Sequence, residues 1–218
     1  MGQKSVFWQA LLATIIVFNL GIFLGYMMEA SRVDKISEMA LQSELRLLDL
    51  EMQLDLASLG GNICSVISEN LAGFADKIFE ESKVLDRYEA ANKISSAIAN
   101  EHRKYDALRA FLWVNAIRAK KQCYANFTTI VYLYQYNEPS IETKARQRVF
   151  SSVLGDVKQA LGNKVILIPL AADNNIETID ILRRVYNVTS YPAVLIDEKK
   201  VVTELKTKEE FLEMIEGK

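Results

Sequence analysis

The N-terminal part of the chain is dominated by one apolar stretch. No charged residue stands between Ser5 and Met28, and most side chains in this stretch are hydrophobic. About twenty such residues are enough for a helix to cross the hydrocarbon core of a bilayer. Trp8 and Tyr26 lie near its two ends, where aromatic side chains of membrane helices meet the interface. The sequence therefore predicts a single transmembrane anchor over residues 1–29, with a membrane as its partner.

A cleaved signal peptide is the alternative interpretation of this stretch. The apolar core of a signal peptide usually has about 7 to 15 residues, followed by a small-x-small cleavage site. Here the apolar run is longer, and Met-Met-Glu-Ala-Ser at residues 27–31 makes a poor site. We therefore expect an anchor that stays attached to the chain.

The orientation of the anchor is less strongly marked. Lys4 on one side is balanced by Arg32 and Lys35 on the other, so the distribution of basic residues does not decide it. The sequons that begin at Asn126 and Asn187, together with a lone pair of cysteines, favour an oxidising compartment. We expect a single-pass membrane protein whose soluble part faces the extracytoplasmic side.

A small-residue pair lies within the predicted anchor. Gly21 and Gly25 are four residues apart and share one face of a helix. Such pairs let two membrane helices approach closely, although glycine is also common in membrane helices for other reasons. A homodimer is therefore an open possibility for the partner of this face.

Composition excludes several classes of function. Among 218 residues, 26 Lys and Arg are mixed with 28 Asp and Glu, without the basic excess of a nucleic-acid surface. His102 is the single histidine, and the two cysteines do not have the spacing of metal ligands. We expect no nucleic-acid partner, no metal and no cofactor. His102 lies near an apolar helical stripe and is interpreted as a packing residue.

Residues 30–122 are predicted to be helical. Between Ala30 and Leu59 neither Pro nor Gly interrupts the chain. Apolar residues recur there at helical spacing on two faces, which predicts contacts on both sides. One face holds Val33, Ile36, Ala40, Leu47, Leu50 and Leu54; the other holds Leu41, Leu45, Leu48, Met52 and Leu59. Gly60 and Gly61 should end this helix, with Asn62 as the N-cap of the next.

Two more helices are expected before residue 123. Their pattern fits either one helix of about sixty residues or a hairpin, and we favour the hairpin because a single helix would expose too much apolar surface. Asp86 is the predicted cap of the third helix. Antiparallel packing would bring Cys64 and Cys123 to the same end, where they form a disulfide or remain two separate buried thiols. The hairpin could also belong to a coiled-coil-like region.

The pattern changes to α/β in residues 123–218. A β-branched and aromatic run at residues 127–136 predicts a strand, and alternating apolar runs and helical stripes follow it. The later elements are expected over residues 141–161 (helix), 164–170 (strand), 176–186 (helix), 191–197 and 200–205 (two strands joined at Glu198-Lys199), and 208–216 (helix). Thr207 is a suitable cap for the last helix.

The order strand, helix, strand, helix, hairpin, helix resembles the core of the thioredoxin family. The stretches LRRVYNVTSYPAVLIDEKKVV and LIPLAADNN carry the resemblance, which covers residues 127–218. It implies a thioredoxin-like α/β fold for the C-terminal domain, with Pro192 as the cis-proline of a substrate-facing loop. The resemblance further implies a groove in which Tyr191, the residue before the proline, pairs with an extended peptide. The alternative is an ordinary trans-proline at an edge strand.

The sequence departs from that family where the redox chemistry should be. The Cys-x-x-Cys of the family would fall within residues 137–143, which read Asn-Glu-Pro-Ser-Ile-Glu-Thr. A thiolate is required for disulfide exchange, and Ser140 is interpreted as a helix cap. We therefore expect a membrane-anchored, redox-inactive module that binds a protein or peptide and is not an enzyme. The alternatives are a structural scaffold or oligomerisation protein, and a non-standard thiol–disulfide oxidoreductase using Cys64 and Cys123.

Overall fold

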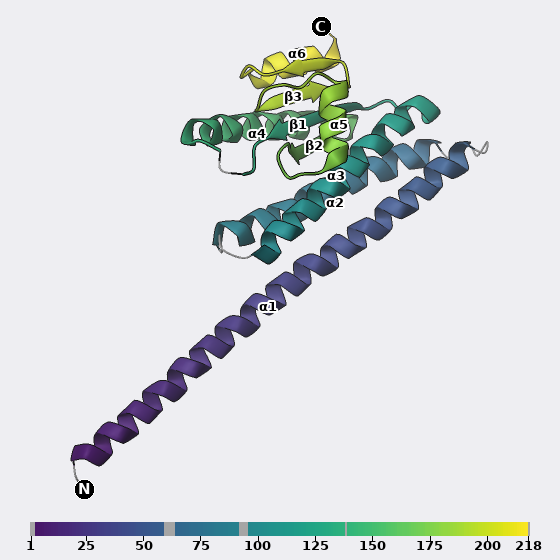
Figure 1. Ribbon diagram of the computed structural model, residues 1–218. Coiled ribbons are helices and arrows are strands. Elements are labelled where there is room, and N and C mark those ends of the chain that lie inside the picture. Colours follow the sequence, from purple (N-terminus) through teal and green to yellow (C-terminus); the bar gives the residue numbers. More distant parts are fainter. Residues whose placement is uncertain (1–2, 59–63, 92–95, 138, 218) are drawn as a thin grey trace. The chain divides into compact units, whose positions relative to one another are not determined.

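The computed structural model describes residues 3–58, 64–91, 96–137 and 139–217 (Figure 1). The chain divides into two compact units, Met1–Met39 and Ala40–Lys218. The division falls within α1 (Gln3–Ser58), which is one continuous helix. The predicted helix breaker at Gly60-Gly61 and the predicted cap Asn62 lie outside the described residues.

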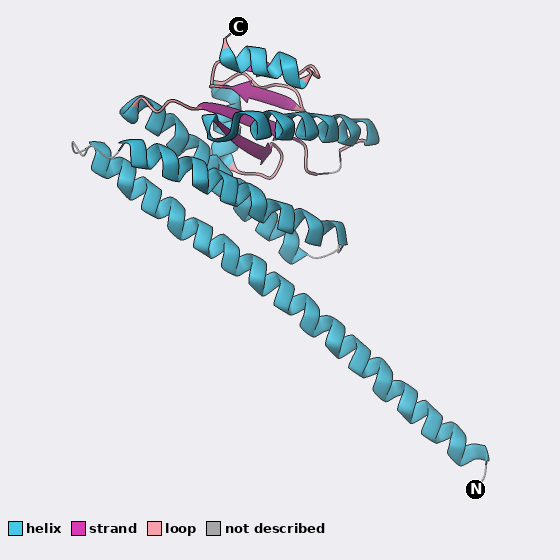
Figure 2. Cartoon of the chain, turned by 180° about the vertical axis from the view of Figure 1, so that it is seen from behind, coloured by secondary structure: helices cyan, strands magenta, loops and turns pink. Residues whose placement is uncertain are grey.

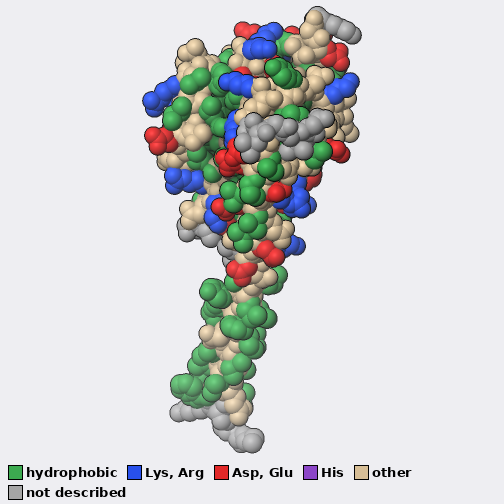
Figure 3. All heavy atoms as spheres, turned by 90° about the vertical axis from the view of Figure 1, so that its right-hand side faces the viewer, with side chains coloured by type: hydrophobic (Ala, Val, Ile, Leu, Met, Phe, Trp, Pro, Cys, Tyr) green, Lys and Arg blue, Asp and Glu red, His purple; other side chains and the backbone are tan. Residues whose placement is uncertain are grey.

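The first unit carries the apolar segment of the chain. Val6–Met28 is long and apolar enough to cross a membrane, and its side chains are exposed. Hydrophobic side chains cover this helix in the space-filling view (Figure 3). A membrane anchor and a signal sequence near an N-terminus both have these features.

The C-terminal part of α1 packs with α2 (Cys64–Ala91) and α3 (Ser96–Cys123). The two predicted apolar faces of α1 have different surroundings. The face with Ala40, Leu47, Leu50 and Leu54 is buried, whereas the other face is exposed at every described position. In α2, apolar residues at helical spacing are buried at Ile67, Leu71, Phe74, Ile78 and Leu85.

The hairpin prediction is confirmed, but its turn lies later than expected. Asp86, the predicted cap of the third helix, lies inside α2, which continues to Ala91. The prediction was wrong because Arg87, Glu89 and Ala90 include good helix formers, and nothing there interrupts the backbone. α3 begins at Ser96, and the connection between the helices lies outside the described residues.

The rest of the second unit is a four-stranded mixed sheet with helices. Its elements are β1 (Thr128–Tyr134), α4 (Ile141–Leu161), the 3-10 turn η1 (Gly162–Lys164), β2 (Val165–Ala171), α5 (Glu177–Val185), β3 (Ala193–Ile196), β4 (Lys200–Val202) and α6 (Lys208–Glu216). The strand order is β2-β1-β3-β4. Figure 2 shows the strands in magenta beside the helices. β1 and β2 are parallel, and the other two pairs are antiparallel.

The ends of several elements follow the predicted local chemistry. Ser140 caps α4 by accepting a hydrogen bond from the Thr143 N–H, and Thr207 forms a capping box with Glu210 at the start of α6. The two strands of the hairpin are shorter than predicted. Asp197 and Glu198 take positive φ angles, so the turn begins one residue earlier than expected.

One face of the sheet and its β2 edge are covered by different helices. α4 and α6 contribute Phe150, Leu154 and Phe211 to a core with alternate residues of the strands. α2 and α3 pack along β2, whose outer edge is otherwise unpaired (Figure 1). At the end of that edge, the N–H of Ala171 donates to Asp106 of α3 at 3.4 Å. The helical hairpin therefore covers one edge strand of the sheet.

Candidate functional site

The loop before β3 holds the two residues that the resemblance singled out. The peptide bond between Tyr191 and Pro192 is cis. Pro192 is buried and Tyr191 is half-buried. The Tyr191 hydroxyl accepts a hydrogen bond from Arg183, which raises the pKa of the guanidinium, although burial acts in the opposite direction. Arg183 also donates to Asp180 at 2.8 Å. The loop is thus held from α5.

The backbone of this loop is open at the residue before the proline. Within the described part of the chain, neither the N–H nor the C=O of Tyr191 takes part in a hydrogen bond. β3 begins two residues later, and Ala193 lies opposite Leu133 near the end of β1. The loop therefore lies at the same end of the sheet as the segment that follows β1.

That segment contains residues 137–143, where the resemblance described above would place a redox pair. Asp173 accepts hydrogen bonds from the backbone N–H groups of Tyr136 at 2.8 Å and Asn137 at 2.9 Å, which fixes the chain as it leaves β1. Ser140 follows as the cap of α4. Glu138 lies outside the described residues. No thiol stands in residues 137–143.

The two cysteines are joined to each other at the opposite end of the sheet. Cys64, the first residue of α2, and Cys123, the last of α3, form a disulfide with a Cα–Cα distance of 5.2 Å. Cys123 precedes β1, whereas residues 137–143 follow it, and a strand of this length spans about 20 Å. The predicted disulfide is therefore present, and it closes the helical hairpin.

A second cluster was not predicted from the sequence. The His102 imidazole lies between Asp106 and Tyr136: its Nδ1 is 3.1 Å from the Asp106 carboxylate, and its ring stacks on Tyr136 at 4.0 Å. The Tyr134 hydroxyl is 3.5 Å from the other ring nitrogen, Nε2. Asp106 also accepts a hydrogen bond from Arg109 at 3.3 Å. His102, Asp106 and Arg109 are all buried.

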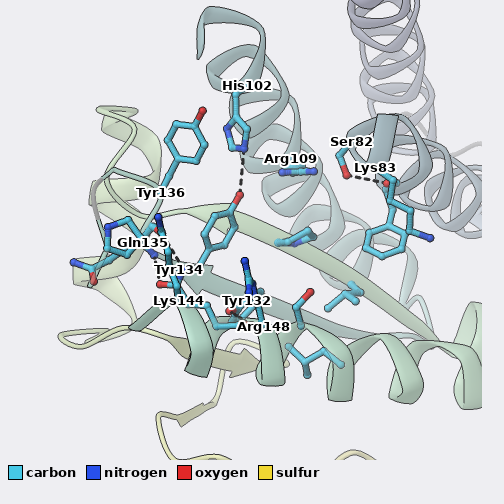
Figure 4. Close-up of a pocket in the computed structure, with 17 residues that line it drawn as sticks. Ser82, Lys83, His102, Arg109, Tyr132, Tyr134, Gln135, Tyr136, Lys144 and Arg148 are labelled. Atoms are coloured by element: carbon cyan, nitrogen blue, oxygen red, sulfur yellow. Dashed lines mark hydrogen bonds between the residues drawn. The ribbon is translucent and has the colours of Figure 1, made fainter. Parts of the chain in front are cut away.

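This cluster forms one wall of a cavity of about 440 Å³ (Figure 4). His102 and Arg109 come from α3, and Tyr134 comes from β1. Lys144 and Arg148 on α4 line the opposite wall. The cavity lies between the helical hairpin and the α4 face of the sheet. Tyr132, also in the lining, is so buried that its pKa is raised above the usual range of tyrosine.

A sequence signal for this cluster was available but was outweighed. His102, Asp106 and Arg109 stand at i, i+4 and i+7, which places them on one face of a helix. His102 and Arg109 alternate at helical spacing with the apolar Tyr105 and Leu112, so the sequence favoured packing for His102 but did not indicate a cluster with Asp106 and Arg109. Here the polar stripe is buried because α3 packs against β2 with that face.

Comparisons with known proteins do not assign the chain to a family. No protein-family model matches the sequence, and no significant match to a curated protein was found. Within the described ranges, no group of three or more His, Cys, Asp or Glu side chains is placed to hold a metal ion.

Proposed function

We propose that this protein is a membrane-anchored, redox-inactive thioredoxin-like binding module for a protein or extended peptide. The observation that carries the proposal is the backbone of Tyr191, which has no hydrogen-bond partner within the described residues and lies two residues before the buried strand β3. The order of strands and helices in residues 128–216 agrees with the order that the thioredoxin resemblance implies.

An unpaired backbone beside a sheet can accept an additional strand. Extended peptides bind in this mode through main-chain hydrogen bonds, while side-chain pockets give specificity. In this protein the N–H and C=O of Tyr191 would supply the main-chain contacts. Arg183 of α5 donates hydrogen bonds to Asp180 and to the Tyr191 hydroxyl, and it thereby supports the loop.

The cysteine arrangement supports a role without disulfide exchange. The disulfide between Cys64 and Cys123 joins two helix ends, at the other end of β1 from the Tyr191 loop. Disulfide exchange needs an accessible thiolate at the reaction site. We expect no turnover when the protein is assayed for insulin reduction with dithiothreitol. Turnover that is lost in the Cys64→Ala variant would favour the oxidoreductase alternative.

The binding proposal is tested by comparing two loop variants with a matched control. We expect Tyr191→Asp and Pro192→Ala to lose a partner that wild-type protein recovers from its own membranes. Tyr124→Asp, at a tyrosine that is 90% exposed, should recover it fully. Thermal melting of each variant separates a lost contact from a lost fold. Equal recovery by all variants would contradict binding at this loop.

The soluble part is proposed to face the extracytoplasmic side. A disulfide is stable in that environment, and the sequon residues Asn126 and Asn187 are both exposed. Protease added to intact cells or spheroplasts should digest the C-terminal domain. A C-terminal domain that is fully protected from the protease would contradict this orientation.

The second candidate is oligomerisation through α1. Its exposed face carries an apolar stripe, in which Leu41, Leu45, Leu48 and Met52 have the alternating spacing of a coiled-coil seam. A second copy of the chain would cover the stripe. Light scattering of the detergent-solubilised protein should then give a dimer or larger assembly for wild type and a monomer for Leu45→Glu/Leu48→Glu. A monomeric wild type would remove this candidate.

A further inference from the structure

The charged side chains described in the lining of the cavity between the helical hairpin and α4 are basic. Its lining contains Lys83, Arg109, Lys144 and Arg148, and it contains no Asp or Glu among the described residues. Lys83 is paired with Glu80 at 2.7 Å, and Arg109 with Asp106. Lys144 and Arg148, in contrast, have no ion-pair partner in the part of the chain that the structure describes. Among the described residues, the lining therefore carries a net positive charge.

Arg109 is the most unusual of these basic residues because it is buried. Only 4% of its surface is exposed, and its Nε has no hydrogen-bond partner within the described residues. A buried donor without an acceptor costs about 1 to 3 kcal/mol, more when the group is charged. Arg109 lines the cavity on the α3 side (Figure 4). An acceptor bound in the cavity would remove this cost.

The rest of the lining is suited to an apolar body. Phe79, Leu154, Leu167 and Pro169 contribute hydrophobic surface, and the tyrosines of β1 add aromatic faces. The volume of about 440 Å³ falls within the usual range of small-molecule sites, which are largely apolar with a few convergent polar groups. A ligand that fits is amphipathic and small.

The surroundings of Arg109 favour a single negative charge on that ligand. Asp106 is fully buried and already occupies one Nη of Arg109 at 3.3 Å. The side of the guanidinium that carries Nε matches the two oxygens of a carboxylate. Asp106 is fully buried and repels a dianion such as a phosphate monoester more strongly than a monoanion, whereas the attracting charges of Lys144 and Arg148 are exposed and screened by solvent.

We propose that this cavity binds a small organic carboxylate with an aromatic or aliphatic body. Arg109 holds the carboxylate group, and Arg148 and Lys144 provide the attracting field from α4. The hydrophobic lining accommodates the body. This site is separate from the loop at Tyr191, so either proposal can fail without the other.

The proposal is tested by calorimetry on the full chain in nanodiscs of zwitterionic lipid. The probes are 2-naphthoate, its neutral counterpart naphthalene-2-carboxamide, and 2-naphthyl phosphate. We expect 2-naphthoate to bind and the other two to bind at least about tenfold more weakly, since one charge-assisted hydrogen bond is worth that much. Equal binding of the acid and the amide, no binding of the acid, or tighter binding of the phosphate would each overturn the proposal.

Variants locate the binding site. Arg109→Gln and the exposed Arg148→Gln should each weaken 2-naphthoate binding at least about threefold, whereas Arg184→Gln, at an exposed arginine outside the lining, should leave it unchanged. Arg148→Gln keeps the test decisive if Arg109→Gln does not fold. Tyr191→Asp should also leave this binding unchanged. Wild-type affinity in Arg148→Gln, or a loss in Arg184→Gln as large as in Arg148→Gln, would contradict the placement.

Discussion

The buried carboxylate of Asp106 collects donors from three parts of the chain. His102 and Arg109 reach it from its own helix, and the Asn174 amide donates from the turn after β2 at 2.6 Å. The N–H of Ala171 completes the set at 3.4 Å. A buried charge is tolerated when it is paired and hydrogen-bonded in this way, and it becomes costly when partners are lost. Asp106 thus ties α3 to the end of β2.

Removing that carboxylate should destabilise the fold strongly. Asp106→Ala leaves Arg109 buried and without its ion-pair partner, so we expect the free energy of unfolding to fall by about 3 kcal/mol or more. Urea denaturation followed by circular dichroism measures the change. Asp156→Asn, at an exposed aspartate of α4, is the control and should change little. A loss similar to that of the control would contradict the role assigned to Asp106.

The turn between β3 and β4 carries a second ion-pair network. Lys120 of α3 donates to Asp197 at 2.8 Å and is also paired with Glu198. Burial raises the pKa of Asp197, but hydrogen bonds and charges from Lys120 and Lys199 outweigh burial and lower it. The Trp113 indole donates to Glu198 at 2.9 Å, which joins the same turn to the helical hairpin.

This network should give the protein an acid-sensitive contribution to stability. Because the pKa of Asp197 is lowered in the folded state, its stabilising effect is present above the ordinary carboxyl pKa of about 4 and is lost as pH falls further. Between about pH 5 and about pH 2, wild type should therefore lose more stability than Asp197→Asn. Melting temperatures across that range provide the measurement. Equal pH dependence in the two proteins would argue against the ion pair, and Glu204→Gln serves as an exposed control.

At the scale of elements, the disulfide is the main covalent constraint on the hairpin. It joins residues 59 positions apart. The chain-entropy estimate for a loop of that length is about 4 kcal/mol. Urea denaturation should therefore give the double variant Cys64→Ala/Cys123→Ala a free energy of unfolding that is lower by about 4 kcal/mol. The free energy of unfolding of reductant-treated wild type should fall toward that of the variant. If reductant leaves this free energy unchanged, the bond is absent from the native protein.

Element boundaries were predictable where local chemistry determines them. The predicted ranges of α4 and α6 agree with the structure at both ends, because Ser140 and Thr207 are strong caps and glycines follow the last turns. The boundary at Asp86 was wrong because an aspartate caps a helix only where the backbone leaves the helix, and the neighbouring residues favour continuation. Strands β1, β3 and β4 are shorter than predicted, whereas β2 has the predicted length and lies one residue later in the chain.

Burial of polar residues was not predictable from the periodicity of one helix. The sequence favoured packing for His102, but its spacing did not indicate that the whole stripe of His102, Asp106 and Arg109 would be buried. The stripe is buried because β2 lies on the other side of α3, and that packing depends on residues distant in the sequence. The exposed and buried faces of α1 could not be distinguished for the same reason: both are apolar, and only tertiary packing selects one.

At the scale of the whole molecule, the membrane assignment depends on the first unit. Val6–Met28 has the features of a spanning helix. We expect the full chain to stay in the membrane fraction after alkaline carbonate extraction, with an intact N-terminus by mass spectrometry. A version that lacks residues 1–29 should be released. A mature protein that begins after residue 28 would instead identify a cleaved signal sequence.

We propose that the protein acts by binding a partner beside Tyr191. Site-specific photo-crosslinking can detect such a partner, with a benzophenone amino acid placed at position 191 or at the exposed position 124 of the full chain in its membrane. We expect a discrete crosslinked partner from position 191, abolished by Pro192→Ala, and none from position 124. Identical crosslinks from both positions, or none from position 191, would contradict it.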